Sequence, residues 1–260
     1  MPINDPDDPR IGDYRNVPDP ALLEERRLFV AEGRYVVRRL LAANGWVTRS
    51  LMVTAAALAA LGKDVDGGAL TIFLVPQAVM NTVTGFNIHR GCLAIGERPA
   101  PPDWHALADG ARRMVVLERV ANADNVGGIF RNARAFGADA ILLGPDCADP
   151  LYRKAIRTSM AATLAVPFAL AAPWPSALRE LRAAGVTVIG LSPCTSAPSI
   201  REAVAAGART AIVAGHEGDG LTPETLAACD TVARIPMAPG IDSLNVATAV
   251  GIALYEMCDL

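Results

Sequence analysis

The sequence has few of the residue types that would mark a zinc, disulfide-bonded or membrane protein. Its five cysteines are scattered without a C-x-x-C pair, and its three histidines show no ligand spacing, so we expect free thiols and no metal site. No apolar run reaches the roughly 18–20 residues that a membrane span needs. The acidic, proline-broken N-terminus does not resemble a signal peptide. We therefore expect a cytoplasmic protein that does not use a membrane.

Positive charge is also scarce. The chain has 24 basic and 27 acidic residues and a formal net charge of −3, which excludes nucleic-acid binding by bulk charge but allows a local basic surface. Only Lys63 and Lys154 among the basic residues are lysines. Arginine favours bidentate phosphate contacts, and a GC-rich genome would give the same bias, so the bias alone does not decide the partner.

The common catalytic and nucleotide-binding motifs are missing as well. There is no G-x-G-x-x-G after the first strand of either half, no G-x-x-x-x-G-K-[ST] and no G-x-S-x-G. Hydride transfer, ATP hydrolysis and acyl transfer by a serine triad therefore lose their best support. An ordinary open-sheet methyltransferase of small molecules would also need an early glycine-rich loop, which is not present.

The composition instead predicts a folded chain of two unequal α/β domains. Hydrophobic residues make up 52% of its 260 residues, enough for a large core. Residues 1–20 hold five Asp and five Pro and predict a flexible lead-in. A small α/β domain is expected over 21–98, a proline-rich linker over 99–110, and a larger domain over 111–260.

Apolar periodicity gives the expected elements. In the first domain the pattern predicts strands at 28–31, 50–53, 71–75 and 92–95 and helices at 34–43 and 54–61. In the second it predicts strands at 114–117, 140–143, 187–191, 211–214 and 231–235, with helices at 126–136, 150–159, 174–184, 222–229 and 245–257. Near-continuous apolar strands that alternate with helices indicate a mostly parallel sheet covered on both faces.

Three polar segments fall at the ends of predicted strands, where ligands bind in α/β sheets. They are residues 123–133, 215–220 and 235–247. Each alone also fits an ordinary turn or helix cap: Ser243 and Asn125 both stand where an N-cap is expected. The three together favour a ligand site.

These segments resemble the three motifs of the SpoU (TrmH-like) RNA 2′-O-ribose methyltransferases of the SPOUT superfamily. The matching residues are Asn125-x-Gly127-x-x-x-Arg131, then Gly215-x-Glu217-Gly218-x-Gly220, then Ile235-Pro-Met237 followed by Ser243-Leu244-Asn245-Val246. The resemblance covers residues 114–260. Residues 29–33 and 89–94 more weakly resemble the family's ribosomal-protein-like substrate-binding domain.

The resemblance implies an α/β fold with a trefoil-knotted, parallel-sheet SPOUT domain after the smaller N-terminal domain. It implies a homodimer that transfers a methyl group from S-adenosylmethionine (AdoMet) to a ribose 2′-hydroxyl of structured RNA, with rRNA favoured over tRNA. Alternatives are a non-catalytic RNA-binding protein or ribosome-assembly factor on the same fold, and methylation of a base. The Ser-Leu-Asn motif is typical of the ribose-directed branch. A role in antibiotic resistance stays open.

Roles for individual residues follow from the same resemblance. Arg131 matches the catalytic arginine, which either stabilises alkoxide charge or, with a depressed pKa, acts as the base. The other catalytic candidates are Asn125, Glu217, Ser243 and Asn245. Candidates for binding AdoMet are Gly215, Ile235, Met237 and Leu244.

RNA contacts are expected from two arginine-rich predicted helices. These clusters are Arg34, Arg38 and Arg39, and Arg153, Lys154 and Arg157; a solvated helix face is the alternative for the first. The chain also departs from the family pattern: Pro239, with Gly240 next, stands where a glycine is usual, and Asn132 where threonine is frequent. We expect an altered loop wall there, and we assign His216 no role.

Overall fold

The computed structural model describes residues 1–15, 19–65, 70–85, 88, 91–204 and 208–258. Its contacts divide the chain into two units. Unit 1 comprises Met1–Ala100 and Pro150–Leu164, and unit 2 comprises Pro101–Asp149 and Ala165–Leu260. Within the described residues, no helix is long and apolar enough to cross a membrane.

Unit 1 is built on a mixed four-stranded sheet with the order β1-β4-β2-β3, in which only β2 and β3 are parallel. Its elements are η1 (Pro9–Tyr14), α1 (Asp19–Glu25), β1 (Leu28–Glu32), α2 (Arg34–Ala42), β2 (Val47–Val53), α3 (Ala55–Leu61), η2 (Gly62–Val65), β3 (Thr71–Leu74), α4 (Gln77–Thr84), β4 (Cys92–Glu97), α7 (Arg153–Thr158) and η3 (Ala162–Leu164). The four expected strands are present, whereas α4 was not expected. Residues 89 and 90 of the expected 89–94 motif lie outside the described residues.

The expected flexible lead-in is wrong at the apolar residues of the described N-terminal segment. Ile3, Ile11 and Tyr14 are buried in the core of unit 1. The Tyr14 hydroxyl is 2.8 Å from the Ser50 hydroxyl of β2, and Pro2 pairs with Leu74 beside β3. The aspartates and prolines predicted mobility, but the apolar side chains between them are buried, and this burial holds the segment on the sheet.

Residues 150–164 group with unit 1, whereas the sequence analysis placed them in the C-terminal domain. This segment contains α7, which packs against β1. Guanidinium nitrogens of Arg153 and Arg157 lie 3.9 and 3.8 Å from the Glu32 carboxylate, and the Trp46 indole donates a 2.9 Å hydrogen bond to the Leu164 carbonyl. The sequence pattern gave the helix but not its tertiary partner.

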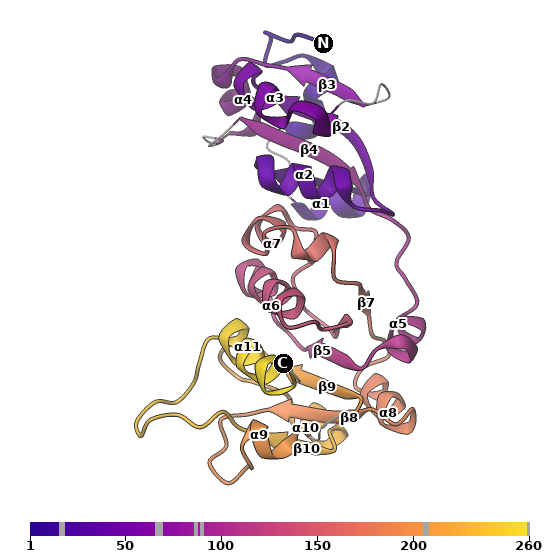
Figure 1. Ribbon diagram of the computed structural model, residues 1–260, viewed down its shortest axis with the longest axis vertical. Coiled ribbons are helices and arrows are strands. Elements are labelled where there is room, and N and C mark those ends of the chain that lie inside the picture. The colour runs from indigo at the N-terminus through magenta and orange to yellow at the C-terminus, as the bar shows by residue number, and fades with distance from the viewer. Residues whose placement is uncertain (16–18, 66–69, 86–87, 89–90, 205–207, 259–260) are drawn as a thin grey trace. The chain divides into compact units, whose positions relative to one another are not determined.

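Unit 2 contains a six-stranded, fully parallel sheet with the order β10-β8-β9-β5-β6-β7 (Figure 1). Its elements are α5 (Trp104–Gly110), β5 (Arg113–Leu117), α6 (Ala123–Ala135), β6 (Ala140–Leu143), β7 (Phe168–Leu170), α8 (Ser176–Ala183), β8 (Thr187–Leu191), α9 (Ile200–Ala203), β9 (Thr210–Ala214), α10 (Pro223–Ala228), β10 (Thr231–Ala233) and α11 (Val246–Glu256). Trp104, Leu178 and Ala228 bring α5, α8 and α10 onto one face. Helices α6 and α11 pack together on the other. The expected parallel sheet covered on both faces is confirmed.

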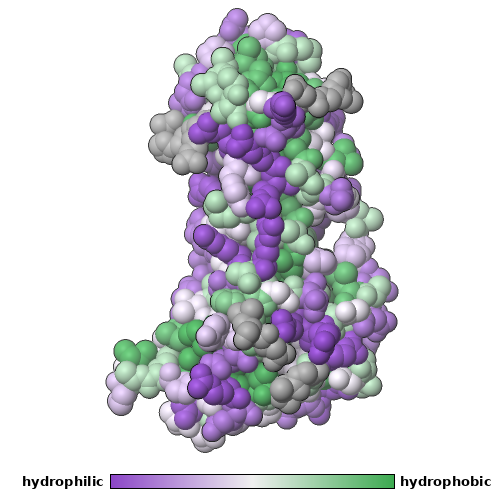
Figure 2. All heavy atoms as spheres, viewed as in Figure 1, coloured by the Kyte–Doolittle hydropathy of each residue, from purple (hydrophilic) through white to green (hydrophobic). Residues whose placement is uncertain are grey.

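The segment between β10 and α11 reaches away from the sheet (Figure 1). Hydrophobic atoms gather at its end (Figure 2), and Ile241 and Leu244 are 54% and 38% exposed. Gly240 has a φ of +84°, a conformation that favours glycine. The altered loop expected around Pro239 therefore contains a turn that depends on the glycine next to it.

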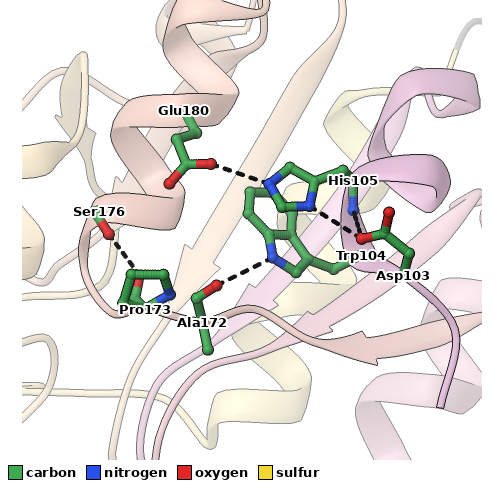
Figure 3. Close-up of polar contacts among 7 residues, drawn as sticks. All are labelled: Asp103, Trp104, His105, Ala172, Pro173, Ser176 and Glu180. Carbon is green, nitrogen blue, oxygen red and sulfur yellow. Dashed lines mark hydrogen bonds and ion pairs between the residues drawn. The ribbon is translucent and has the colours of Figure 1, made fainter.

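The expected linker over 99–110 is wrong from Trp104 onward, because α5 occupies that part and belongs to unit 2. The Trp104 side chain is buried, and its indole donates to the Ala172 carbonyl at 3.3 Å. His105 stacks on it and bridges Asp103 and Glu180, with both ring nitrogens 3.0 Å from a carboxylate oxygen (Figure 3). Strand β7 and helix α9, of three and four residues, are also absent from the expected elements; both are too short to show a period.

Candidate functional site

A cavity of about 330 Å³ opens at the carboxyl ends of β8, β9 and β10. Its walls combine apolar side chains such as Leu191 and Leu226 with the loop that follows β9. The structure brings to this cavity all four candidates for binding AdoMet, together with two of the catalytic candidates: Gly215, Ile235, Met237, Leu244, Glu217 and Ser243. A pocket of this size and mixed character suits a small organic ligand.

The loop after β9 closes on itself through two glycines. A Cβ added at Gly215 would lie 2.6 Å from the Gly220 carbonyl group, and Gly220 has a φ of +71°. His216 organises the turn, since its Nδ1 accepts hydrogen bonds from the amides of Gly218 at 3.0 Å and Asp219 at 3.2 Å. The sequence gave no reason to assign His216 a role, because this contact depends on the folded turn.

Three polar residues from three distant segments form one hydrogen-bonded line. Asn245 caps α11 by accepting from the amides of Ala247 and Thr248 through its Oδ1. Its Nδ2 donates to Asn125 Oδ1 at 2.8 Å, and Asn125 Nδ2 donates to the Glu217 carboxylate. The cap fixes the orientation of Asn245, and this in turn requires Glu217 to be the acceptor. Glu217 thus anchors the line in the cavity wall.

The two ordinary cap interpretations are wrong. The N-cap of α6 is Asn122, which accepts from the Asp124 amide at 2.9 Å, and Asn125 lies inside the helix. The N-cap of α11 is Asn245, not Ser243, which is exposed and lines the cavity. Neither Asn125 nor Ser243 therefore caps a helix.

Helices α6 and α11 approach closely enough to bring these motifs together. A Cβ on Gly128 would lie 2.9 Å from the Cβ of Ala247, and a Cβ on Gly251 would lie 2.8 Å from Nδ2 of the Asn132 side chain. Asn132 itself donates to the Ala247 carbonyl at 2.7 Å. The asparagine that replaces the family's threonine thus ties the first motif to the start of α11.

Arg131 stands apart from the line of hydrogen bonds. It lies on α6 one turn beyond Gly128, and its side chain is exposed. Among the residues that the structure describes, its guanidinium has no hydrogen bond or ion pair. An exposed guanidinium without a protein partner can receive an external phosphate or a developing negative charge.

The arginines expected to bind RNA all belong to unit 1. Arg38 forms a 2.7 Å ion pair with Asp64 and also donates to the Ala60 carbonyl, so its charge already has an internal partner. Arg39 is exposed and lies over the Tyr35 ring, 5.2 Å from the ring centroid, and Arg34 is half-buried at the start of α2. The second cluster, Arg153, Lys154 and Arg157, lies on α7, with the two arginines near Glu32.

Glu118 is a buried residue behind the cavity loop that the sequence analysis missed. It follows β5 directly, and only 1% of it is exposed. Burial opposes its charged form, but hydrogen bonds from Thr225, Thr222 and Trp174 outweigh this effect and lower its pKa. A charged residue directly after an apolar strand was the available signal.

A parallel sheet with a glycine-closed loop and a cavity of mixed polar and apolar lining at its carboxyl edge defines an α/β protein that binds a small organic ligand there. Among the described residues, no group of three or more His, Cys, Asp or Glu side chains can hold a metal ion. The polar groups around the cavity are hydroxyls, an imidazole, carboxylates and backbone groups.

Comparisons with known proteins identify the family. The profile of the SpoU rRNA Methylase family matches residues 112–255. A Mycobacterium tuberculosis protein named as an uncharacterized tRNA/rRNA methyltransferase is 42% identical over 98% of this chain and 90% of its own length. A 23S rRNA (guanosine-2′-O-)-methyltransferase of Burkholderia is 33% identical over 68% of this chain and 72% of its own.

A solved structure agrees with these relatives. The AdoMet-bound rRNA methyltransferase of Sinorhizobium meliloti has a TM-score of 0.83 and 28% identity, and the match covers 99% of this chain and 97% of that one. The chain belongs to the SpoU rRNA methylase family, a family of RNA methyltransferases whose methyl donor is AdoMet. The resemblance and the expected cofactor are confirmed.

Proposed function

We propose that this protein transfers a methyl group from AdoMet to a ribose 2′-hydroxyl of structured RNA, with rRNA the favoured substrate. The observation that carries the proposal is the line Glu217–Asn125–Asn245 at the AdoMet cavity. The 2′-O-methyltransferase name of the Burkholderia relative supports the ribose as acceptor. Cytoplasmic action follows from an RNA substrate and stays a prediction.

The cavity residues fit AdoMet. When bound, AdoMet supplies a methyl group that is already electrophilic, so the residues need only bind the donor and activate the acceptor. Ile235, Met237 and Leu244 offer an apolar surface for the adenine, and the loop from Gly215 offers backbone donors and acceptors. The close Gly215–Gly220 contact leaves no room for a side chain at Gly215, so the backbone of the loop is accessible there.

Activation of the 2′-hydroxyl falls to Arg131 and the asparagine line. Arg131 is exposed and free of described partners, which suits it to anchor the neighbouring phosphate and to stabilise negative charge on the ribose oxygen while the hydroxyl proton passes to solvent water and the methyl group leaves the donor's sulfur. A guanidinium stays protonated in nearly all proteins, so we assign it this electrostatic role. Asn125, Asn245 and Ser243 supply hydrogen-bonding groups that orient the ribose.

RNA binding is assigned to unit 1. Arg39 and Arg34 on α2 are the strongest candidates of the first cluster, because Arg38 is already paired with Asp64. Arg153, Lys154 and Arg157 on α7 form the second. Contacts of this kind bind phosphates and ribose hydroxyls and so recognise the shape of a folded RNA.

The trefoil knot, the ribosomal-protein-like character of unit 1 and the homodimer belong to the same proposal. The knot and the ribosomal-protein-like character of unit 1 are proposed from the membership in this family. Exposed apolar side chains on unit 2, among them Leu170 at 61% and Tyr255 at 58%, support a second copy as partner. Light scattering on the purified protein tests this, with twice the chain mass of 27.2 kDa as the expected result.

The test of the reaction is to identify the methylated nucleoside. Purified protein, labelled AdoMet and total RNA would be incubated, and the RNA digested to nucleosides and separated. Label in a 2′-O-methylnucleoside supports the proposal, whereas label in a methylated base overturns it. AdoMet binding without transfer to naked RNA or assembly intermediates would instead favour a non-catalytic RNA-binding role.

A further inference from the structure

Glu118 connects three segments that are distant in sequence. Its Oε1 accepts from the Trp174 indole at 3.0 Å, from the Thr222 hydroxyl at 2.8 Å and from the Thr225 hydroxyl at 2.6 Å. Its Oε2 accepts from the Thr222 amide at 2.9 Å. The bonds to Thr222 fix the chain immediately after Leu221, a residue of the cavity wall.

The next residue holds the same loop from outside. Arg119 has a φ of +58°, unusual for a residue with a side chain, and Arg119 Nη2 donates to Asp219 Oδ2 at 2.9 Å. The Glu118 amide donates to the Ala214 carbonyl at 2.9 Å, just before the loop begins. Two consecutive residues therefore contact the loop at its start, at Asp219 and at its end.

This loop has little freedom to adjust. Residues 214–221 all line the cavity, and the backbone at Gly215 already approaches Gly220 as closely as a glycine permits. A displacement of Thr222 or Asp219 is consequently transmitted to the cavity wall.

We propose that Glu118 and Arg119 form a clamp that holds loop 214–221 in the conformation that binds AdoMet. Glu118 is then a positioning residue: it does not line the cavity and acts through Thr222. The proposal rests on the assignment of this cavity to AdoMet.

The main variant is Glu118→Gln, which keeps the side-chain size but presents an N–H to one of the donors. We expect its dissociation constant for AdoMet to rise about tenfold, because a buried donor loses its acceptor. Hydrogen exchange in residues 215–221 should become faster without ligand. Because saturating AdoMet restores the binding conformation of the loop, including Glu217, kcat should fall less than kcat/KM for AdoMet.

Asp230→Asn is the matched control. The Asp230 carboxylate also joins a backbone amide, that of Val188 at 2.9 Å, to a side chain, that of Arg182 at 2.6 Å, but it does not line the cavity. The Asp230→Asn substitution should lower thermal stability and leave the AdoMet dissociation constant unchanged.

A charge exchange tests the outer half and does not depend on the folding of Glu118→Gln. Arg119→Asp and Asp219→Arg should each weaken AdoMet binding, and the double variant should recover part of the loss. Equal AdoMet affinities of the wild type, Glu118→Gln and the single exchange variants would overturn the clamp alone. Absence of AdoMet binding by the wild type would overturn the proposed function as well.

Discussion

Gly215 and the asparagine line decide whether the site can form, because neither has a substitute nearby. Gly215 has no room for a methyl group beside Gly220. Asn245 serves two ends at once, since it caps α11 and orients Asn125. The role of Gly215 can be tested by adding a methyl group. The role of Asn245 can be tested by comparison with an N-cap that has no such second partner.

Gly215→Ala should weaken AdoMet binding by about tenfold or more, because overpacking costs about 1–3 kcal/mol and about 1.4 kcal/mol corresponds to a factor of ten. Gly218→Ala is the matched control. Its added Cβ would lie 3.3 Å from the His216 ring, which can yield slightly. Calorimetric titration with AdoMet measures both, and equal losses would contradict the crowding argument.

Asn245→Ala and Asn122→Ala should each lower the free energy of unfolding by about 1 kcal/mol, the usual value of an N-cap. Only Asn245→Ala should also reduce methyl transfer, because Asn122 caps α6 without contacting Asn125. Denaturant unfolding and transfer assays on both variants make the comparison. Full activity of Asn245→Ala would remove the line from the mechanism.

The elements show where sequence reasoning succeeded and where it stopped. Apolar strands such as Ala140–Leu143 and Thr187–Leu191 were predicted to the residue, and residues of the second and third motifs line the cavity. The pattern missed α5, because prolines before Trp104 indicated a linker while the burial of that tryptophan is a tertiary effect. It missed Glu118 and His216 for the same reason: their partners come together only after folding.

Helices α5 and α8 are joined by a bridge that titrates. Hydrogen bonds that the His105 ring donates to the carboxylates of Asp103 first and Glu180 second raise its pKa above the ordinary value of 6.5. The protonated ring therefore contributes its full stabilisation below about pH 6.5, and this contribution is lost as the pH rises through the raised pKa.

His105→Gln should remove that dependence. The Tm difference between wild type and variant should be largest near pH 6 and shrink toward pH 9, because only the charged ring attracts both carboxylates (Figure 3). The AdoMet affinity should not change. A Tm difference that grows with pH would contradict the assignment.

For the whole molecule, a negative net charge means that RNA must be held by a local basic surface. Arg39→Ala should weaken RNA binding and reduce the slope of log affinity against log salt by about one, while AdoMet binding stays unchanged. Arg179→Ala, an exposed arginine on α8, is the control and should leave the slope as it is. An unchanged slope for Arg39→Ala would remove α2 from the RNA face.

In the proposed reaction, this site methylates a ribose with the help of Arg131. The most direct measurement is transfer from labelled AdoMet to RNA of cells that lack the gene, with the new methyl group mapped, for wild type and Arg131→Ala side by side. We predict one 2′-O-methylated ribose with the wild type. The variant should bind AdoMet normally but transfer methyl groups about 100-fold or more slowly, since removal of an electrostatic stabiliser costs this much. Transfer by Arg131→Ala at the wild-type rate, or methylation of a base, would contradict the account.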